Sequence, residues 1–304
     1  MLAFVLASAL AFTPADASLA HLTATNLVAR HTPRDAGTRR GAAAADFLLD
    51  AASATGADVV QDRFSAMTPT GMRRFVNVST ELASAGTNAG WVVFLSHYDT
   101  KPGSACPGAN DGASTSGLLV ALARAFRRAD GLPLNVMLVW TDGEECVGSY
   151  ADDDGLWGST RAAARLAESG RMVRAVVCLD MLGDSDLHVS VPRNSSPELR
   201  AAALRAAKAA SMADKVSLID EFVTDDHVPF LRKGFRAIDL IDFEYGSAPG
   251  RNDWWHTPKD TPDKISEESL LAAGRLAVAL FSELAGMDAP ASPSRGQSAR
   301  CIAR

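Results

Sequence analysis

The chain has 304 residues, of which 47% are hydrophobic and 22% are charged, and its formal net charge is −6. These proportions are ordinary for a globular enzyme. The negative charge argues against nucleic acid as a partner, because phosphate binding needs a basic surface. The length fits one large α/β domain or two small ones, and no segment has the composition of a linker between two cores.

The N-terminal segment is apolar from Leu2 to Phe12, and Ala15-Asp16-Ala17 then follows the small-x-small pattern of a signal-peptidase site. We therefore expect residues 1–20 to be a signal or an apolar N-terminal segment and the protein to be secreted or periplasmic. The apolar run lacks a preceding basic region, so the alternatives are a start further upstream or a segment that does not direct export. No apolar run of the mature chain is long enough to cross a bilayer, so we expect no membrane segment there.

Apolar periodicity and turn residues predict helices that alternate with strands. In chain order the predicted elements are helix 39–54, strands 59–64 and 74–78, strand 91–96, helix 116–127, strand 135–140, helix 159–169, strand 175–179, strand 187–191, helix 197–211, helix 228–233, strand 236–243 and helix 267–285. This order predicts a single α/β domain over residues 21–286, with a mostly parallel twisted sheet, an antiparallel edge and helices on both faces. Residues 287–304 are predicted to be a disordered tail.

Polar side chains follow the predicted strands at the edge of the sheet where ligands bind in open α/β folds. His97 and Asp99 end one strand, and because they are two residues apart they point to the same side. Glu144 and Glu145 end another, and adjacent carboxylates there repel each other unless they share a cation or a proton. Asp111 lies in a glycine-rich turn before a helix. Each motif also has an ordinary structural interpretation, as a surface pair or a solvated turn.

Two further segments carry acids and imidazoles. Asp180 closes an apolar strand, where a lone carboxylate is costly unless it is paired. His256 lies in a long loop between Trp255 and Thr257, and Asp225-Asp226-His227 precedes a short helix. Either feature is also compatible with simple packing or a polar helix start.

Together these residues predict a zinc site. Two histidines and three acids, each in its own segment, form the nitrogen and oxygen donor set that zinc prefers: His97, Asp111, Glu145, Asp180 and His256. Five ligands with a shared aspartate would hold two ions about 3.5–4 Å apart, whereas three would hold one zinc with an open position. Asp99 is near enough to orient His97.

The four cysteines have no metal-ligand spacing. Cys106 and Cys146 both lie on loops at the edge of the sheet and would be able to form a disulfide in an exported protein. Cys178 lies inside an apolar strand and is expected to be a small core residue.

Five ordered motifs resemble those of the zinc aminopeptidase superfamily, which also contains the glutaminyl cyclases. They cover Phe94 to Leu270 and comprise His97-Tyr98-Asp99, Gly108-Ala109-Asn110-Asp111-Gly112, Asp142-Gly143-Glu144-Glu145, Leu179-Asp180-Met181 and Trp255-His256-Thr257. Three features are most similar to bacterial glutaminyl-peptide cyclotransferase-like proteins. These are the segment 225–234, the acidic loop that leads from Glu145 to Leu156-Trp157-Gly158-Ser159, and Trp255 before the zinc histidine.

The resemblance implies a role for each matched residue. Asp111, Glu145 and His256 would bind one zinc, with His97 and Asp180 completing a second site if a second zinc binds. Glu144 would be the proton shuttle, in an acidic hydrogen-bond chain with Asp180 and Asp225. Trp255 would form a wall of the substrate pocket, Tyr150 stands where animal cyclases carry a tryptophan, and His227 would support the site from behind.

Three functions follow from the resemblance and are kept open. The first is a zinc-dependent cyclase that converts the N-terminal glutamine of peptides to pyroglutamate with release of ammonia. The second is a di-zinc aminopeptidase, and the third is a non-catalytic binding domain of the same fold. In the first two the partners are peptide or protein N-termini, and we expect a monomer.

Overall fold

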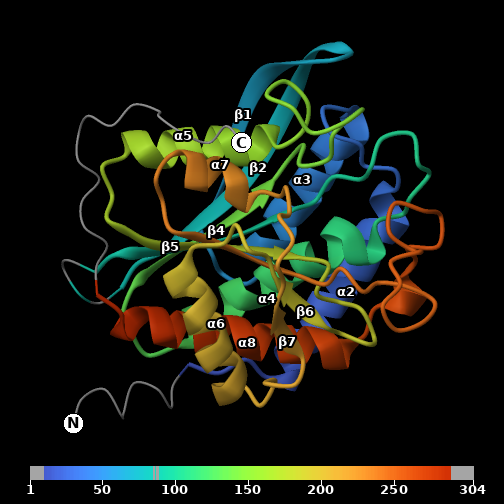
Figure 1. Cartoon of the computed structure of the whole chain (residues 1–304). Coiled ribbons are helices and arrows are strands. Elements are labelled where there is room, and N and C mark those ends of the chain that lie inside the picture. The colour runs from blue at the N-terminus through green and yellow to red at the C-terminus, as the bar shows by residue number, and fades with distance from the viewer. Residues whose placement is uncertain (1–9, 85, 87–88, 289–304) are drawn as a thin grey trace.

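The seven predicted strands and one further strand, β7, pair into one eight-stranded sheet in the order β1-β2-β4-β3-β5-β8-β6-β7 (Figure 1). The computed structural model describes residues 10–84, 86 and 89–288. The strands are β1 (Val59–Thr68), β2 (Gly71–Leu82), β3 (Trp91–His97), β4 (Asn135–Thr141), β5 (Val173–Asp180), β6 (Val189–Val191), β7 (Val216–Leu218) and β8 (Ala237–Ile241). The central strands β4, β3, β5 and β8 are parallel, so their carboxyl ends meet at one edge of the sheet.

Antiparallel pairing flanks this parallel centre on both sides. The predicted hairpin is confirmed as β1 and β2, and β2 pairs antiparallel with β4. On the other side β6 pairs antiparallel with β8 and parallel with β7. The expectation that residues 187–191 form an edge strand was wrong, because β7 covers β6. With three residues, β7 is too short to produce an alternating pattern in the sequence.

Helices cover both faces of the sheet, as predicted. They are α2 (Pro14–His31), α3 (Arg39–Ser53), α4 (Thr115–Arg128), α5 (Trp157–Glu168), α6 (Pro197–Ala209), α7 (His227–Arg232) and α8 (Glu267–Gly286), with short turns η1 (Ala109–Ser114) and η2 (Pro262–Lys264). Helices α2, α3, α4, α6 and α8 contribute to one hydrophobic core, whereas α5 and α7 pack on the opposite face. Figure 1 shows α5 and α7 together above the sheet in that view.

Strand β3 shows how alternation positions the site between these two cores. Val92 and Phe94 point into the core under α2, α4 and α8, while Val93 and Leu95 point into the core under α5 and α7. Full burial contributes about 1.5–3 kcal/mol for each such side chain. The register of the strand is therefore strongly specified, and His97 at its end has a defined position.

The N-terminal boundary that we expected at residue 20 falls inside α2. Thr13 caps this helix by accepting a hydrogen bond from the Asp16 amide, and Asp16 is fully buried. Its carboxylate forms ion pairs of 2.8 Å with Arg124 and 2.9 Å with Arg128. The residues from Pro14 onward are thus part of the folded domain. The apolar residues before Leu10 and the tail from residue 289 lie outside the described residues, and secretion stays a prediction.

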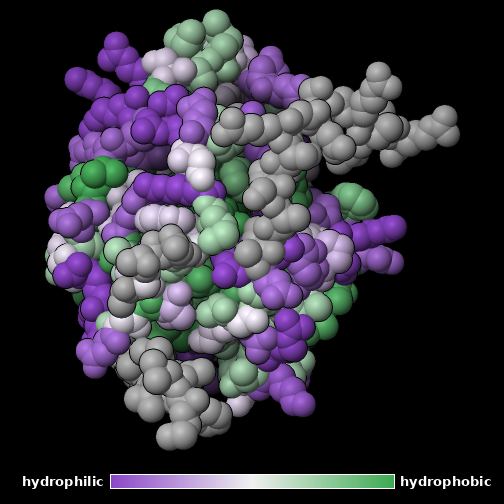
Figure 2. Space-filling view, turned by 90° about the vertical axis from the view of Figure 1, so that its left-hand side faces the viewer, coloured by the Kyte–Doolittle hydropathy of each residue, from purple (hydrophilic) through white to green (hydrophobic). Residues whose placement is uncertain are grey.

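Helix α8 is long and apolar enough to cross a membrane by length and composition alone, which the sequence analysis did not anticipate. Its most apolar stretch is 56% buried inside the domain. It packs against α6 and α2, as expected for a core helix of a globular protein. On the face shown in Figure 2, hydrophilic and hydrophobic residues are interspersed over the surface that the grey atoms leave visible.

Candidate active site

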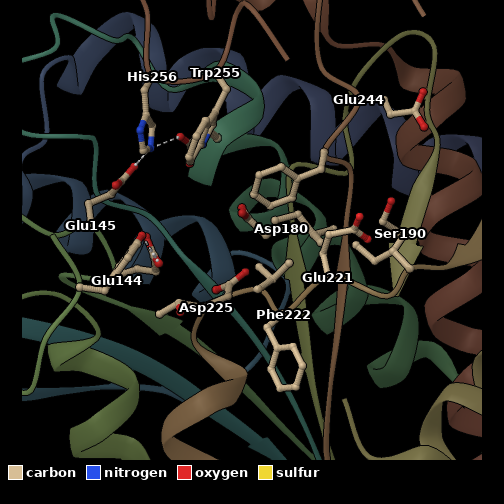
Figure 3. Close-up of a pocket in the computed structure, with 17 residues that line it drawn as sticks. Glu144, Glu145, Asp180, Ser190, Glu221, Phe222, Asp225, Glu244, Trp255 and His256 are labelled. Atoms are coloured by element: carbon tan, nitrogen blue, oxygen red, sulfur yellow. Dashed lines mark hydrogen bonds and ion pairs between the residues drawn. The ribbon is translucent and has the colours of Figure 1, made fainter. Parts of the chain in front are cut away.

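The carboxyl ends of the parallel strands open into a pocket of about 560 Å³ (Figure 3). Loops after β3, β4, β5 and β8 contribute to its walls, together with the loop that carries Trp255 and His256. The predicted acids Asp111, Glu144, Glu145, Asp180 and Asp225 all line it. The sheet therefore brings together residues that are up to 145 positions apart in the chain, from Asp111 to His256.

The first group of candidate ligands consists of His97, Asp111 and Asp180. The His97 Nε2 atom lies 3.1 Å from Asp111 Oδ1 and 3.2 Å from Asp180 Oδ1. The turn η1 brings Asp111 to this position through Gly112, whose φ is +86°. A Cβ atom on Gly112 would lie 2.9 Å from the His97 ring, so this close approach requires glycine.

The second group consists of Asp111, Glu145 and His256. His256 Nε2 lies 2.9 Å from Glu145 Oε1 and 3.4 Å from Asp111 Oδ2. Asp111 thus uses one carboxylate oxygen in each group and bridges them. All five residues that were predicted as ligands lie in one cluster, in the arrangement expected for either one or two zinc ions.

The chemistry of these groups fits a metal ion. Asp111 Oδ2 and Glu145 Oε2 are buried and have no hydrogen-bond donor among the described residues. Burial and the charge of Asp111 raise the pKa of Glu145 well above its usual range. Burial opposes protonation of His97, but the carboxylates of Asp180 and Asp111 outweigh it and raise the pKa of this imidazole. A divalent cation would relieve the repulsion among the acids and occupy the unpartnered oxygens.

Asp99 supports the ligands from behind, as the sequence predicts. Its two carboxylate oxygens accept hydrogen bonds from the backbone amides of Glu144 and Glu145, at 3.1 Å each. Asp99 Oδ1 is also 3.5 Å from His97 Nδ1. One buried carboxylate therefore orients three residues of the site.

Glu144 lies beside the metal-ligand groups and is buried. Burial, together with the neighbouring charge of Glu145, raises the pKa of Glu144 well above its usual range. The Tyr150 hydroxyl donates a hydrogen bond of 2.7 Å to Glu144 Oε1. A carboxyl group held in this way is suited to accept and return a proton.

The expected hydrogen-bond chain from Glu144 through Asp180 and Asp225 is not present as direct hydrogen bonds among the described residues. Asp180 is directed at His97, and Asp225 accepts hydrogen bonds from the Cys178 thiol and the Asp226 amide. Burial raises the pKa of Asp225 to about 7, and the nearby charge of Asp180 adds to this effect. The acids form one electrostatic cluster without a continuous chain.

His227 does not lie beside the ligands, contrary to the prediction. Its Nε2 atom is 3.0 Å from the Asn194 side chain, and its Nδ1 atom is 3.9 Å from Asp239. Burial lowers the pKa of this imidazole to about 3. The start of α7 turns the His227 ring toward Asn194 and Asp239, an orientation that the local sequence does not reveal.

Aromatic residues form one wall of the pocket. The Trp255 ring stacks on His256 with centroids 3.9 Å apart and also packs against Phe243. Figure 3 shows His256, Glu145 and Glu144 at one end of the pocket and Ser190, Glu221 and Glu244 at the other. This second end combines Ser190 of β6 with Glu221 and Glu244 on two loops, and no sequence motif links the three residues.

Cys106 and Cys146 do not form the disulfide that the sequence analysis considered. Both thiols are free and buried. Cys146 Sγ is 3.0 Å from the Lys101 ammonium, whereas Cys106 Sγ contacts Asp260 at 3.6 Å. Lys101 also lies 3.5 Å from Glu145 Oε2 and is a charged neighbour of the site that sequence reasoning missed.

An α/β sheet with buried histidines and carboxylates at the carboxyl ends of its parallel strands is an arrangement suited to an enzyme that holds a metal ion. The profile of Peptidase family M28 matches residues 77–281. The chain belongs to this family.

Known relatives within this fold include both cyclases and peptidases. A solved structure, the glutaminyl cyclase of an Acidobacteriales bacterium, has a TM-score of 0.82 and 31% sequence identity, covering 91% of this chain and 96% of that one. The bovine glutaminyl-peptide cyclotransferase-like protein is 28% identical over 74% of this chain and 65% of its own length. Aminopeptidase YwaD of Bacillus subtilis is 31% identical over 63% of this chain and 40% of its own length. This chain thus spans only part of both curated relatives.

Proposed function

We propose that this protein is a zinc-dependent glutaminyl-peptide cyclotransferase that acts on peptide N-termini. The observation that carries the proposal is the joint position of Glu144, the Asp111–Glu145–His256 group and the Trp255 wall in one pocket. Such a pocket accepts an N-terminal residue and its side chain together. Among the curated relatives, the bovine cyclase-like protein covers 74% of this chain and the Bacillus subtilis aminopeptidase covers 63%.

The reaction forms one carbon–nitrogen bond and breaks another. The α-amine of an N-terminal glutamine attacks its own side-chain carbonyl carbon, and the amide nitrogen leaves as ammonia. Glu144 accepts a proton from the amine and delivers one to the leaving nitrogen, so that the carboxylate is regenerated. Asp111, Glu145 and His256 would hold the zinc, which supplies Lewis-acid polarisation of the carbonyl when bound.

The chain's own residues prepare this step. Tyr150 orients Glu144 by a hydrogen bond, and Asp99 fixes the backbone of Glu144 and Glu145. The Trp255 and Phe243 rings pack against each other and form an apolar wall of the pocket. Burial, the charge of Glu145 and, to a smaller extent, the charge of Asp225 favour the protonated form of Glu144.

A di-zinc aminopeptidase is the second candidate, and one observation favours it. The His97–Asp111–Asp180 group is complete and shares Asp111 with the other group. In that reaction Glu144 is the general base toward water, and the first residue of the peptide is released. The intact ligands and Glu144 argue against a non-catalytic binding domain. The proposal includes a monomeric, secreted or periplasmic protein whose catalytic unit extends from Pro14 of α2 to Gly286 of α8.

Ammonia release from Gln-initiated peptides tests the proposal. The zinc-loaded protein should release one ammonia for each peptide consumed, and Glu144→Gln should lower kcat by at least about a thousandfold while metal content is unchanged. Glu198→Gln, on the surface helix α6, is the matched control and should retain activity. Full turnover by Glu144→Gln would refute the assigned role of Glu144.

A further inference from the structure

The turn that carries Asp111 has an irregular backbone. Gly108 has a φ of +63°, Asp111 has φ −78° and ψ 100°, and Gly112 again has a positive φ. The peptide groups of residues 107–111 therefore do not enter a regular helix or sheet. Because they are buried, they need hydrogen-bond partners from other parts of the chain.

Arg34 supplies the donors on one side of this turn. Its side chain is completely buried, although it is charged and follows the end of α2. It donates hydrogen bonds to the carbonyl oxygens of Pro107 at 2.7 Å, Gly108 at 2.6 Å and Asp111 at 3.4 Å. It also donates to the carbonyl of Tyr98, which immediately follows the ligand His97. A Cβ atom on Gly108 would lie 2.7 Å from this guanidinium, so Gly108 leaves the space that Arg34 occupies.

Asp260 supplies the acceptors on the other side. It is also completely buried, and its carboxylate accepts hydrogen bonds from the amides of Asn110 at 2.7 Å and Asp111 at 3.2 Å. Tyr245 holds this carboxylate in place with a hydroxyl hydrogen bond of 2.7 Å. Asp260 lies four residues after His256 and closes the same loop through its amide, which donates to Thr257 at 3.2 Å.

Both peptide groups of Asp111 are thus fixed by a buried charged side chain. Its N–H donates to Asp260 and its carbonyl accepts from Arg34, which defines the direction of the Asp111 side chain. Its carboxylate must reach His97 and His256 on opposite sides, at 3.1 and 3.4 Å. A shift of a few tenths of an ångström in the turn would move both ligand groups.

A purely structural role is the competing explanation. Buried charges that are well hydrogen-bonded occur in many cores, and removing one destabilises a fold whatever its function. In this protein, however, the two residues bind the backbone of one ligand, and Asp260 links it to the loop of another. Groups that orient metal ligands in this way typically change metal affinity by 10- to 100-fold when they are lost, an effect separate from global stability.

We propose that Arg34 and Asp260 are positioning residues that hold the Asp111 carboxylate between His97 and His256 and thereby set the affinity of the metal site. This inference rests on the metal site of the proposed function. It applies equally if the reaction is cyclisation or hydrolysis.

Zinc affinity and stability, measured separately on the full chain, test the inference. Competition with a fluorescent zinc chelator gives the affinity, and urea unfolding of the metal-free protein gives the stability. Asp260→Asn should weaken zinc binding about 10- to 100-fold, because an amide places a donor against one of the two backbone amides. Arg34→Lys should act in the same direction, since one ammonium cannot replace the forked guanidinium.

Asp16→Asn is the matched control, because Asp16 is another fully buried aspartate that is held by arginines far from the ligands. It should lower stability and leave zinc affinity within twofold. Tyr245→Phe is a milder variant that removes a single hydrogen bond from Asp260, and it should weaken zinc binding severalfold. This variant keeps the test decisive if Asp260→Asn does not fold.

The outcomes separate this inference from the proposed function. Zinc affinities of Asp260→Asn, Arg34→Lys and Tyr245→Phe within twofold of the unaltered protein would overturn the inference and leave the function standing. Zinc binding with the expected losses, but without conversion of Gln-initiated peptides, would refute the cyclase and support the inference. Failure of the unaltered protein to bind zinc would refute both.

Discussion

Asp99→Asn is a sensitive test of how the site is preorganised. The carboxylate of Asp99 is fully buried and accepts two backbone hydrogen bonds of 3.1 Å, from Glu144 and Glu145. An asparagine retains one acceptor oxygen. Its NH2 group would face the second backbone N–H, so two hydrogen-bond donors would oppose each other. The Asp99 contact of 3.5 Å to His97 also loses its charge.

The magnitude follows from these contacts. A hydrogen bond to a charged group contributes about 1.5–3 kcal/mol, and an unsatisfied buried donor costs about 1–3 kcal/mol. Together they predict a loss of about 2.5–6 kcal/mol, shared between folding and the site. At about 1.4 kcal/mol for each factor of ten, we expect zinc affinity and kcat/KM each to fall at least tenfold.

The assay is chelator competition for zinc together with steady-state kinetics on a Gln-initiated peptide. Asp62→Asn is the control, because Asp62 pairs with Arg161 and Arg165 at the surface of the sheet. Asp99→Asn protein with zinc affinity and kcat/KM within twofold of the unaltered protein would refute the reasoning.

Four further outcomes are expected. Tyr150→Phe removes the hydrogen bond to Glu144, and kcat should fall about tenfold with KM within twofold; an unchanged kcat would count against this role. Asp16→Asn should lower the free energy of unfolding by about 2–4 kcal/mol in urea titrations, and a loss below 0.5 kcal/mol would contradict the ion pairs as drawn. Burial raises the pKa of Asp242 from 3.8 to about 7, so the folded state binds the proton more tightly than the unfolded state. The free energy of unfolding of the metal-free protein should therefore fall as the pH rises from about 4 to 7 and level off above about pH 7. Asp242→Asn should reduce that slope by up to about 1.4 kcal/mol per pH unit, and an identical slope would refute the assignment. Chelation of the metal should abolish activity and lower Tm by an amount that grows with the zinc concentration of the reference sample; an unchanged Tm would argue against a bound metal.

The central strands and the clustering of the candidate ligands were predictable because both depend on local patterns. An apolar run that ends in polar residues identifies a buried strand and its carboxyl end at once. Topology then brings these ends together, which is why His97, Glu145 and Asp180 were placed correctly without coordinates. Asp111 was predictable from the glycine-rich turn that allows a close approach.

The parts that were missed depend on tertiary contacts. Strand β7 has too few residues to show alternation, and it is recognised only by its pairing with β6. The orientation of His227 is determined by the start of α7, which turns its ring toward Asn194 and Asp239. Arg34 is one of several charged residues in a polar segment, and the sequence gives no sign that its side chain is buried beneath Asp111.

The boundary at residue 20 illustrates a conflict between two signals. The small-x-small pattern at Ala15-Asp16-Ala17 matches a processing site, yet Thr13 and Asp16 together form a helix capping box. In the structure Thr13 and Asp16 begin α2, and Asp16 is buried against two arginines of α4. Sequence alone contains both patterns, and processing at residues 15–17 stays a prediction.

Mass spectrometry of a Gln-initiated peptide, incubated with the zinc-loaded protein, tests the central claim most directly. The account predicts a product that has lost one ammonia and is otherwise intact, absent with Glu144→Gln and present with Glu198→Gln. A product that lacks the whole first residue would contradict the cyclase and establish an aminopeptidase. An unchanged peptide under the same conditions would contradict both enzymatic functions for this substrate class.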